Sequence, residues 1–259
     1  MRGKVLVCSC MIQVVMLLFL NCAIGGQRLE LTSSDNHPLI GEMSLPGKKD
    51  IGAAVILLPM YRHTRQSYQP LLSHLTRNGF TVLAMDLRGH GESRLAADGS
   101  DDEQRVIDRD PSIFNEMYRD VEAASQYLAR TTGIPQQRQL IIGASVGCSV
   151  AVHSVSKDVI RPAGVVLLTP GENYLGVPTL EHVTTWPGTP LLILSSREEQ
   201  QRGADAIYEA LGDNGAELHL FDKTNIHGTR MFGQVGGVEQ LIVDWLAAKI
   251  PPPPQKDRQ

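Results

Sequence analysis

The 259-residue sequence has few cysteines, and none of its histidine and cysteine groups has the spacing of metal ligands. Three of the four cysteines, Cys8, Cys10 and Cys22, lie near the start of the chain, so only Cys148 remains in the rest. A single cysteine forms no intrachain disulfide, which excludes a fold held together by disulfides. With no base beside it in the sequence, Cys148 is expected to be a small, buried and unreactive thiol.

The sequence also lacks a block of basic charge, an internal repeat and a glycine-rich phosphate loop. Its formal net charge is −4, and its lysines and arginines are neither clustered nor interleaved with aromatic residues. Nucleic acid is therefore not an expected partner, and no cofactor or metal ion is expected. With 42% hydrophobic residues, the chain is long enough to bury one sizeable core.

Only one long hydrophobic run is present, at residues 5–20, after two basic residues. Small residues at 23 and 25 suit cleavage by a signal peptidase. A membrane-spanning helix needs roughly 20 apolar residues, so this shorter run predicts a signal peptide over residues 1–25 and no stable membrane span. We expect a secreted or periplasmic protein. The alternative is a lipoprotein anchored through Cys22, although Asn21 stands where a small residue is expected.

After this segment, apolar stretches of strand length alternate with stretches of helical periodicity. An opening hairpin is predicted at residues 28–32 and 39–45, followed by strands at 53–58, 80–85, 138–143, 164–168, 190–194 and 216–221. Helices are predicted at 66–78, 112–131, 146–157, 203–212 and 237–249. This order predicts an α/β fold with a mostly parallel eight-stranded sheet and helices on both faces, in one domain over residues 26–250. The acidic segment 96–110 is expected to be a solvated face, and residues 251–259 a proline-rich tail.

The strongest indication of a catalytic residue is the motif at residues 143–147. The apolar residues 140–142 lead into Gly143-Ala144-Ser145-Val146-Gly147, which a helix-compatible segment follows. This is the strand, sharp turn and helix of a G-x-S-x-G nucleophile elbow, in which the serine hydroxyl projects from a strained turn. Ser145 is therefore the candidate nucleophile.

A serine hydroxyl needs a histidine to take its proton, and on this kind of fold the acid and then the histidine follow the serine in the chain. Four histidines follow Ser145. His153 lies on the same predicted helix, His182 in a connection bounded by proline and glycine, and His219 within a predicted strand. His227 lies in a loop between the last strand and the last helix, so it is the candidate base.

The acid is expected at the end of the strand 190–194, where the sequence reads Ser195-Ser196-Arg197-Glu198-Glu199. No aspartate is present there. A glutamate can accept the same hydrogen bond from an imidazole, and Glu199 is preferred over Glu198. Both glutamates also suit the solvated first turn of a helix, which is the alternative interpretation.

The segment at residues 79–93, which ends in Asp86-Leu87-Arg88-Gly89-His90-Gly91-Glu92-Ser93, resembles the α/β-hydrolase family together with the elbow and the histidine loop. The resemblance is to its branch of monoglyceride lipases and serine aminopeptidases, and it extends from about residue 52 to residue 248. It implies an oxyanion hole formed by the backbone N–H groups of Val146 and of Tyr61, in the loop after the third strand. That loop often contains His-Gly in the family, whereas this chain has Pro59-Met60 before Tyr61. The usual acid of the family is aspartate, from which Glu199 also departs.

The pattern predicts a serine hydrolase of the carboxylesterase type, acting on a small-molecule ester through a Ser145-His227-Glu199 triad and an acyl-enzyme. The connection at residues 170–189 is too short for a large cap domain, so the pocket is expected to be open. Amide and thioester substrates use the same chemistry and stay open at this point. The alternative from another class is a catalytically inactive binding protein of the same fold, which the altered loop at Pro59 and the missing aspartate would suit.

Overall fold

The computed structural model describes residues 26–47, 49–212 and 215–252. The predicted signal peptide at 1–25, with Cys22, and most of the predicted tail at 251–259 lie outside the described residues.

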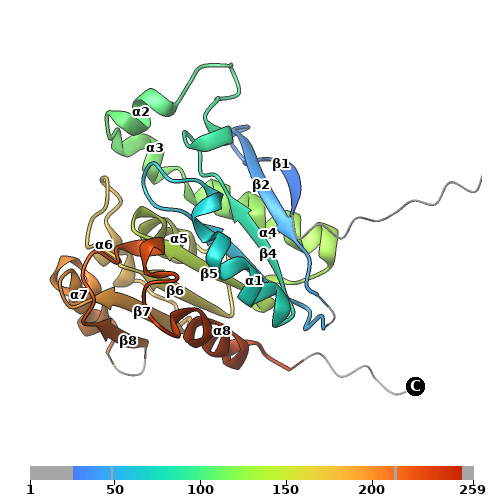
Figure 1. Ribbon diagram of the computed structural model, residues 1–259. Coiled ribbons are helices and arrows are strands. Elements are labelled where there is room, and N and C mark those ends of the chain that lie inside the picture. The colour runs from blue at the N-terminus through green and yellow to red at the C-terminus, as the bar shows by residue number, and fades with distance from the viewer. Residues whose placement is uncertain (1–25, 48, 213–214, 253–259) are drawn as a thin grey trace, which may run out of the picture.

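A single open sheet of eight strands runs through the molecule (Figure 1). Its order is β1-β2-β4-β3-β5-β6-β7-β8. The strands from β3 onward pair in parallel, and β2 pairs antiparallel with both β1 and β4. The bounds are β1 Gln27–Thr32, β2 Pro38–Ser44, β3 Ala53–Leu58, β4 Phe80–Met85, β5 Gln139–Ala144, β6 Gly164–Leu168, β7 Leu191–Ser196 and β8 Ala216–Phe221. The predicted fold class, with its opening hairpin and mostly parallel sheet, is confirmed.

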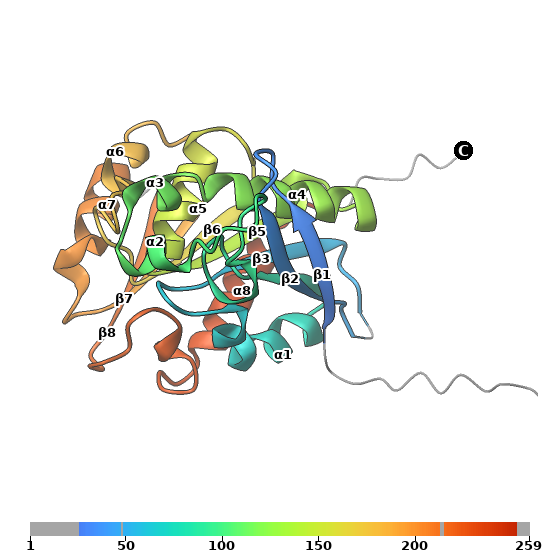
Figure 2. The ribbon, with the colours of Figure 1, turned by 90° about the horizontal axis from the view of Figure 1, so that it is seen from above.

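The central strands are buried along their whole length, because helices cover both faces of the sheet. Helices α1 Gln69–Arg77 and α8 Val238–Lys249 pack on one face, whereas α4 Tyr118–Thr132, α5 Val146–Ser156 and α7 Ala204–Leu211 pack on the other (Figure 2). Each face has its own hydrophobic cluster. The parallel strands therefore all end at the same edge of a rigid sheet, and the loops that follow them carry the candidate site.

The predicted helix at 112–131 is divided into a short α3, Pro111–Asn115, and α4. The start of α3 is set locally, because the Asp110 side chain accepts a hydrogen bond from the Ser112 backbone N–H and Pro111 occupies the first turn. The other short helices are α2 Glu103–Ile107 and α6 Thr179–Val183. None of the helices among the described residues is long and apolar enough to cross a membrane.

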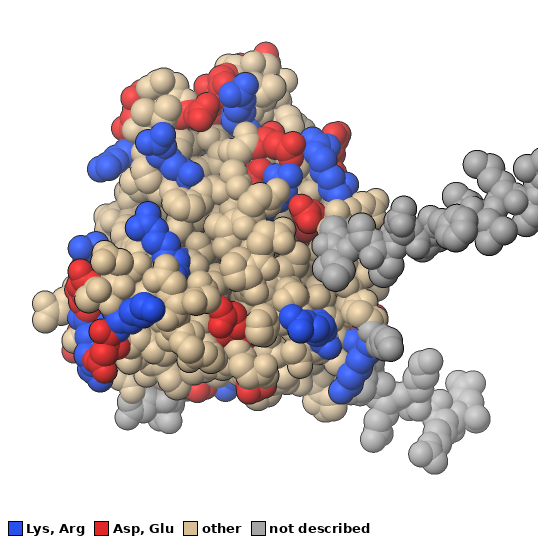
Figure 3. All heavy atoms as spheres, viewed as in Figure 1, with Lys and Arg blue, Asp and Glu red and all other residues tan. Residues whose placement is uncertain are grey.

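The acidic segment 96–110 is only in part the solvated face that its composition predicts. It folds into a lobe that contains α2 and lies beside α3 (Figure 1). Val106 is buried, and the buried Asp102 carboxylate lies 3.2 Å from the His37 imidazole. Gly89 makes the close packing possible, since a Cβ at this residue would lie 2.5 Å from the Val106 side chain. On the face shown in Figure 3, charges of both signs are dispersed rather than gathered by sign.

Candidate active site

The turn at Ser145 has the geometry that its motif predicts. Strand β5 ends at Ala144 and α5 begins at Val146, and Ser145 between them has φ 52° and ψ −118°. A positive φ is uncommon for a residue with a side chain and marks a backbone held in place by its surroundings. The glycines on either side allow close contact: a Cβ at Gly143 would lie 2.2 Å from the Gly147 carbonyl oxygen, and a Cβ at Gly147 would lie 2.4 Å from the Leu58 carbonyl oxygen. Strand, elbow helix and the end of β3 therefore touch through backbone atoms.

The imidazole of His227 and the carboxylate of Glu199 are in contact. His227 lies in the loop after β8 and Glu199 in the turn after β7, and the distance from Nδ1 to Oε2 is 2.5 Å. A carboxylate only accepts, so Nδ1 carries the hydrogen, and in the neutral ring Nε2 is then left as the acceptor. This is the tautomer that a general base requires.

Glu198 is directed elsewhere. Its carboxylate accepts from the Asn225 backbone N–H at 3.4 Å, at the surface. The Glu199 backbone N–H is held by the Ser196 carbonyl at 3.1 Å, and the Glu199 Oε1 atom lies 3.4 Å from the exposed Arg202 guanidinium. Of the two glutamates weighed from the sequence, the structure therefore brings Glu199 to His227.

The histidine loop packs against both the elbow strand and the loop after β3. Gly228, with φ 55°, has no room for a side chain: a Cβ there would lie 2.4 Å from the Met60 sulfur and 3.4 Å from the Ala144 Cβ. The Gly228 N–H donates to the Thr169 hydroxyl at 3.0 Å. Since Ala144 precedes Ser145 and Met60 precedes Tyr61, these contacts bring the serine, the histidine and the proposed oxyanion loop to one edge of the sheet.

The proposed oxyanion donors are the backbone N–H groups of Val146 and Tyr61. Within the described residues, neither N–H donates to another residue. Val146 is the first residue of α5, where an N–H has no acceptor inside the helix. The Tyr61 side chain is used separately, since its hydroxyl donates to the Val106 carbonyl at 3.2 Å and anchors the lobe that carries α2. The backbone N–H of Tyr61 is thus available to another acceptor.

Two residues beside the site were not identified from the sequence. Tyr174, in the connection after β6, lies edge-on to His227 with ring centroids 6.2 Å apart. Thr169, at the end of β6, is buried at φ 56° and accepts from the histidine loop. The length of the 170–189 connection gives no sign of these residues. Its position directly after a central parallel strand is the signal in the sequence that points to them.

The remaining candidates lie away from this cluster. His153 and His182 stack on each other with centroids 4.1 Å apart, and burial lowers the pKa of His153 to about 4. His219 is exposed on β8. The Cys148 thiol is buried, as predicted, and burial raises its pKa, which keeps it protonated and unreactive.

The segment that resembles the hydrolase family shapes its loop. The buried Arg88 guanidinium donates to Asp120 at 2.8 Å and to Asp35 at 2.7 Å. Glu92 pairs with Arg65 at 2.6 Å, and the Arg65 guanidinium also contacts the buried Asp86. These contacts hold the loop after β4 in shape.

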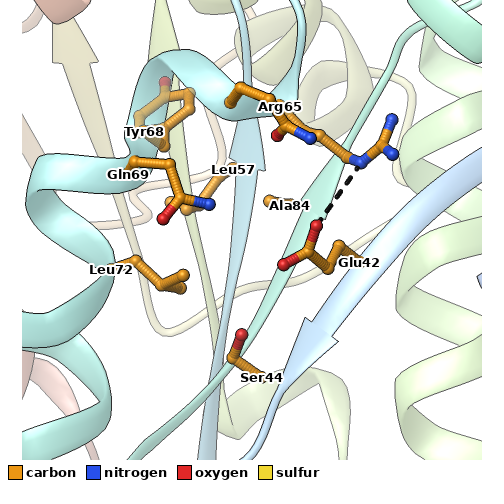
Figure 4. A pocket seen from close by; sticks show the side chains of 9 residues that line it. Glu42, Ser44, Leu57, Arg65, Tyr68, Gln69, Leu72 and Ala84 are labelled. Carbon is orange, nitrogen blue, oxygen red and sulfur yellow. Dashed lines mark ion pairs between the residues drawn. The ribbon is translucent and has the colours of Figure 1, made fainter. Parts of the chain in front are cut away.

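A small pocket between β2 and α1 is separate from the candidate site (Figure 4). Glu42 and Arg65 face each other across it at 3.8 Å, and none of the sequence-predicted site residues lines it. In the part of the chain that the structure describes, no group of three or more histidine, cysteine or acidic side chains is arranged to hold a metal ion.

Comparison with known proteins places this geometry in context. Residues 49–186 match the family model described as serine aminopeptidase, S33. The matched range includes Ser145 and stops before Glu199 and His227. No curated protein matches the sequence significantly.

Solved structures with the same fold include several hydrolases. An esterase of Pyrococcus furiosus is 20% identical, with a TM-score of 0.67, and the alignment covers 88% of this chain and 92% of that one. A thermostable carboxyl esterase of Bacillus coagulans is 12% identical, with a TM-score of 0.67 and coverage of 88% and 100%. A 2,6-dihydroxy-pseudo-oxynicotine hydrolase is 15% identical, with a TM-score of 0.68 and coverage of 87% and 68%. At these sequence identities the similarity shows a shared fold and no more.

Proposed function

The chain belongs to the serine aminopeptidase S33 family of α/β-hydrolases, and from this premise we propose that it is a serine hydrolase of carboxylic esters. The observation that carries the proposal is the 2.5 Å contact between His227 Nδ1 and Glu199 Oε2. The loop of His227 packs on Ala144, the residue before the serine of a strained elbow. A protein that only binds ligands needs no such oriented imidazole.

In the proposed reaction, the Ser145 oxygen attacks the ester carbonyl while His227 Nε2 takes the serine proton. Glu199 holds the ring and stabilises the imidazolium that forms. The negative charge on the carbonyl oxygen is stabilised by the N–H groups of Val146 and Tyr61. His227 then gives its proton to the leaving alcohol, an acyl-enzyme remains on Ser145, and water activated by the same histidine hydrolyses it.

Two observations favour a small or exposed ester. The connection between β6 and β7 contains only the five-residue α6, so it builds no large cap over the site. Structures of the same fold include an esterase of Pyrococcus furiosus and a carboxyl esterase of Bacillus coagulans. The family description also names peptide hydrolysis, and an amide is therefore the competing substrate class.

A fluorophosphonate probe and p-nitrophenyl acetate test the proposal on the wild-type protein, with Ser145→Ala beside it. We expect wild type to be labelled and to hydrolyse the ester, and Ser145→Ala to lose labelling and at least about 10³-fold of kcat. Ser73→Ala, on α1, is the matched control and should behave as wild type. An aminoacyl-p-nitroanilide cleaved faster than the ester would assign an aminopeptidase instead. A wild-type protein that reacts with none of the three reagents would favour the inactive binding protein.

We also propose that the protein is exported and begins near Gly26 after removal of residues 1–25. Support comes from the basic start, the apolar run at 5–20 and the small residues at 23 and 25. Intact-mass analysis of protein from the periplasmic fraction of a bacterial host tests this. A mass that retains residues 1–25 contradicts export, and a diacylglyceryl adduct on Cys22 would replace simple cleavage by a lipid anchor.

A further inference from the structure

The Tyr61 side chain extends from the loop after β3 to the lobe that carries α2. Its hydroxyl lies 3.2 Å from the Val106 carbonyl and 3.4 Å from the Ile107 carbonyl, at the end of α2, so its one hydrogen is donated to either of them. Its ring contacts the rings of His90 and Phe114, with centroids 6.4 Å and 6.3 Å away. The loop after β3 is thus attached to a segment 45 residues further along the chain.

Hydrogen bonds within the loop fix the direction of the Tyr61 N–H. The His63 N–H donates to the Met60 carbonyl at 3.0 Å, which closes a tight turn around Tyr61. The Met60 carbonyl and the Tyr61 N–H belong to one planar peptide group, so this bond also orients the N–H. His63 Nδ1 lies 3.0 Å from the Tyr61 carbonyl and braces the next peptide group. The aim of the proposed oxyanion donor therefore depends on where the whole turn lies.

The turn lies between the lobe and the histidine loop. A Cβ at Gly228, the residue after His227, would lie 2.4 Å from the Met60 sulfur, so Met60 packs directly on that backbone. The Tyr61 side chain holds the other side of the turn through α2. Because closely packed atoms leave little free space, a turn held from both sides has little freedom to shift.

The lobe is a firm point of attachment. The Val106 side chain is buried, and a Cβ at Gly89 would lie 2.5 Å from it. Arg105 joins α2 to the start of α3, since its guanidinium donates to the Asp110 carboxylate at 3.0 Å and to the Ser112 hydroxyl at 2.8 Å. The position of α2 is therefore set by its own packing, and α2 in turn sets the position of the loop after β3.

We propose that Tyr61 is a positioning residue for the oxyanion hole, whose side chain attaches the turn at residues 60–63 to the lobe and so keeps its own backbone N–H aimed at the substrate carbonyl oxygen. The inference rests on the proposed function. A donor stabilises the developing charge best when it is already in place, because a donor that must first move costs free energy during the reaction. Loosening the turn should therefore affect the transition state more than substrate binding.

Tyr61→Phe removes the hydroxyl and keeps the ring. We expect a fall of roughly twofold to tenfold in kcat, the range of one neutral hydrogen bond. The affinity for a small alkyl trifluoromethyl ketone should fall by the same factor, because its adduct with the serine places a negatively charged oxygen in the oxyanion hole. KM for p-nitrophenyl acetate should stay within about twofold. Tyr127→Phe, on α4, is the matched control and should keep wild-type values.

Val106→Ala loosens the lobe and leaves the Tyr61 hydroxyl and its acceptor in place. Val106 is 2% exposed, and Val243 on α8 is 1% exposed, so Val243→Ala is the matched control for the loss of buried methyl groups. Both variants should unfold at a lower temperature, and only Val106→Ala should lower kcat and the affinity for the ketone. Combined with Tyr61→Phe, Val106→Ala should lower kcat by a smaller factor than it does alone, because the hydroxyl through which it acts is gone.

The outcomes separate this inference from the proposed function. Parallel falls in kcat and in affinity for the ketone in Tyr61→Phe, at unchanged KM and with cooperative thermal unfolding, support the positioning role. If wild type is active and Tyr61→Phe keeps both values or changes only KM, the positioning role is wrong and the proposed function stands. Equal changes of kcat in Val106→Ala and Val243→Ala also contradict the role of the lobe. A wild-type protein that neither hydrolyses the ester nor takes the fluorophosphonate label overturns the proposed function and this inference together.

Discussion

Replacing Glu199 by glutamine tests the assignment on which the proposed mechanism depends most. The substitution keeps the size of the side chain and removes its charge. The glutamine amide can also turn its NH2 group toward His227 Nδ1, which stabilises the tautomer with the hydrogen on Nε2. In that tautomer the ring cannot take the Ser145 proton.

The size of the effect follows from the geometry. The Glu199 carboxylate and the ring are in hydrogen-bond contact, so the centres of charge in the ion pair formed during reaction are about 4 Å apart. The side chains are 14% and 24% exposed, which suits an effective dielectric constant of about 20. The attraction that is lost is then about 4 kcal/mol, or about 10³-fold in kcat. Arg202, at 3.4 Å from the other carboxylate oxygen, already offsets part of the negative charge, so a loss between about 10² and 10³ is expected.

Steady-state hydrolysis of p-nitrophenyl acetate by Glu199→Gln and Glu198→Gln, measured side by side, checks this value. Glu198 contacts the exposed backbone of Asn225, and its substitution should change kcat by less than about twofold. A larger loss from Glu198→Gln would reverse the assignment. Small losses from both would mean that another group orients His227.

Two further predictions concern the elbow and the stability of the fold. Gly147→Ala should abolish activity and lower the free energy of unfolding by more than about 2 kcal/mol, because the added Cβ would lie 2.4 Å from the Leu58 carbonyl oxygen. Wild-type activity and thermal unfolding in this variant would contradict the close contact between the elbow and the end of β3. The second prediction concerns His153, because burial lowers its pKa from 6.5 to about 4. Between these pH values the unfolded chain binds the proton more readily than the folded chain does. The free energy of unfolding that His153 contributes above pH 6.5 is therefore lost as the pH falls toward 4. Denaturant unfolding should show that acidification from pH 7 to pH 4.5 costs wild type about 2 kcal/mol more than His153→Phe, and equal pH dependence of the two proteins would refute this.

Local patterns predicted the elements of this fold well. Strands β3, β4 and β6 begin and end where their apolar runs do, because a strand buried on both faces is largely apolar. The edge strand β8 also has its predicted bounds, which its alternating pattern indicates. The sequence also predicts the turn at Ser145, because the glycines that its close contacts require lie two residues before and after it. Chain order and a position in the loop after the last strand then singled out His227 among the histidines after the elbow, and its catalytic role stays a prediction.

The sequence does not predict features that depend on contacts between segments far apart in the chain. The acidic composition of residues 96–110 predicts a solvated face, whereas Asp102 in that segment is buried against His37, which is 65 residues away. Composition reports the average preference of a segment for water. It does not report which single side chain meets a partner.

The sequence by itself determined that a serine, an acid and a histidine follow three strands of one parallel sheet, and therefore that they share one edge. Only the tertiary structure decided which of two adjacent glutamates meets the imidazole, because a one-residue change around a turn redirects the side chain and the loop after β8 sets where the ring lies. It alone placed Tyr174 edge-on to His227, in a loop that a bridge between Gly171 and Gly203 ties to a segment 32 residues away. Such packing is invisible in the chain, since its energy comes from the fit of surfaces that meet only after folding.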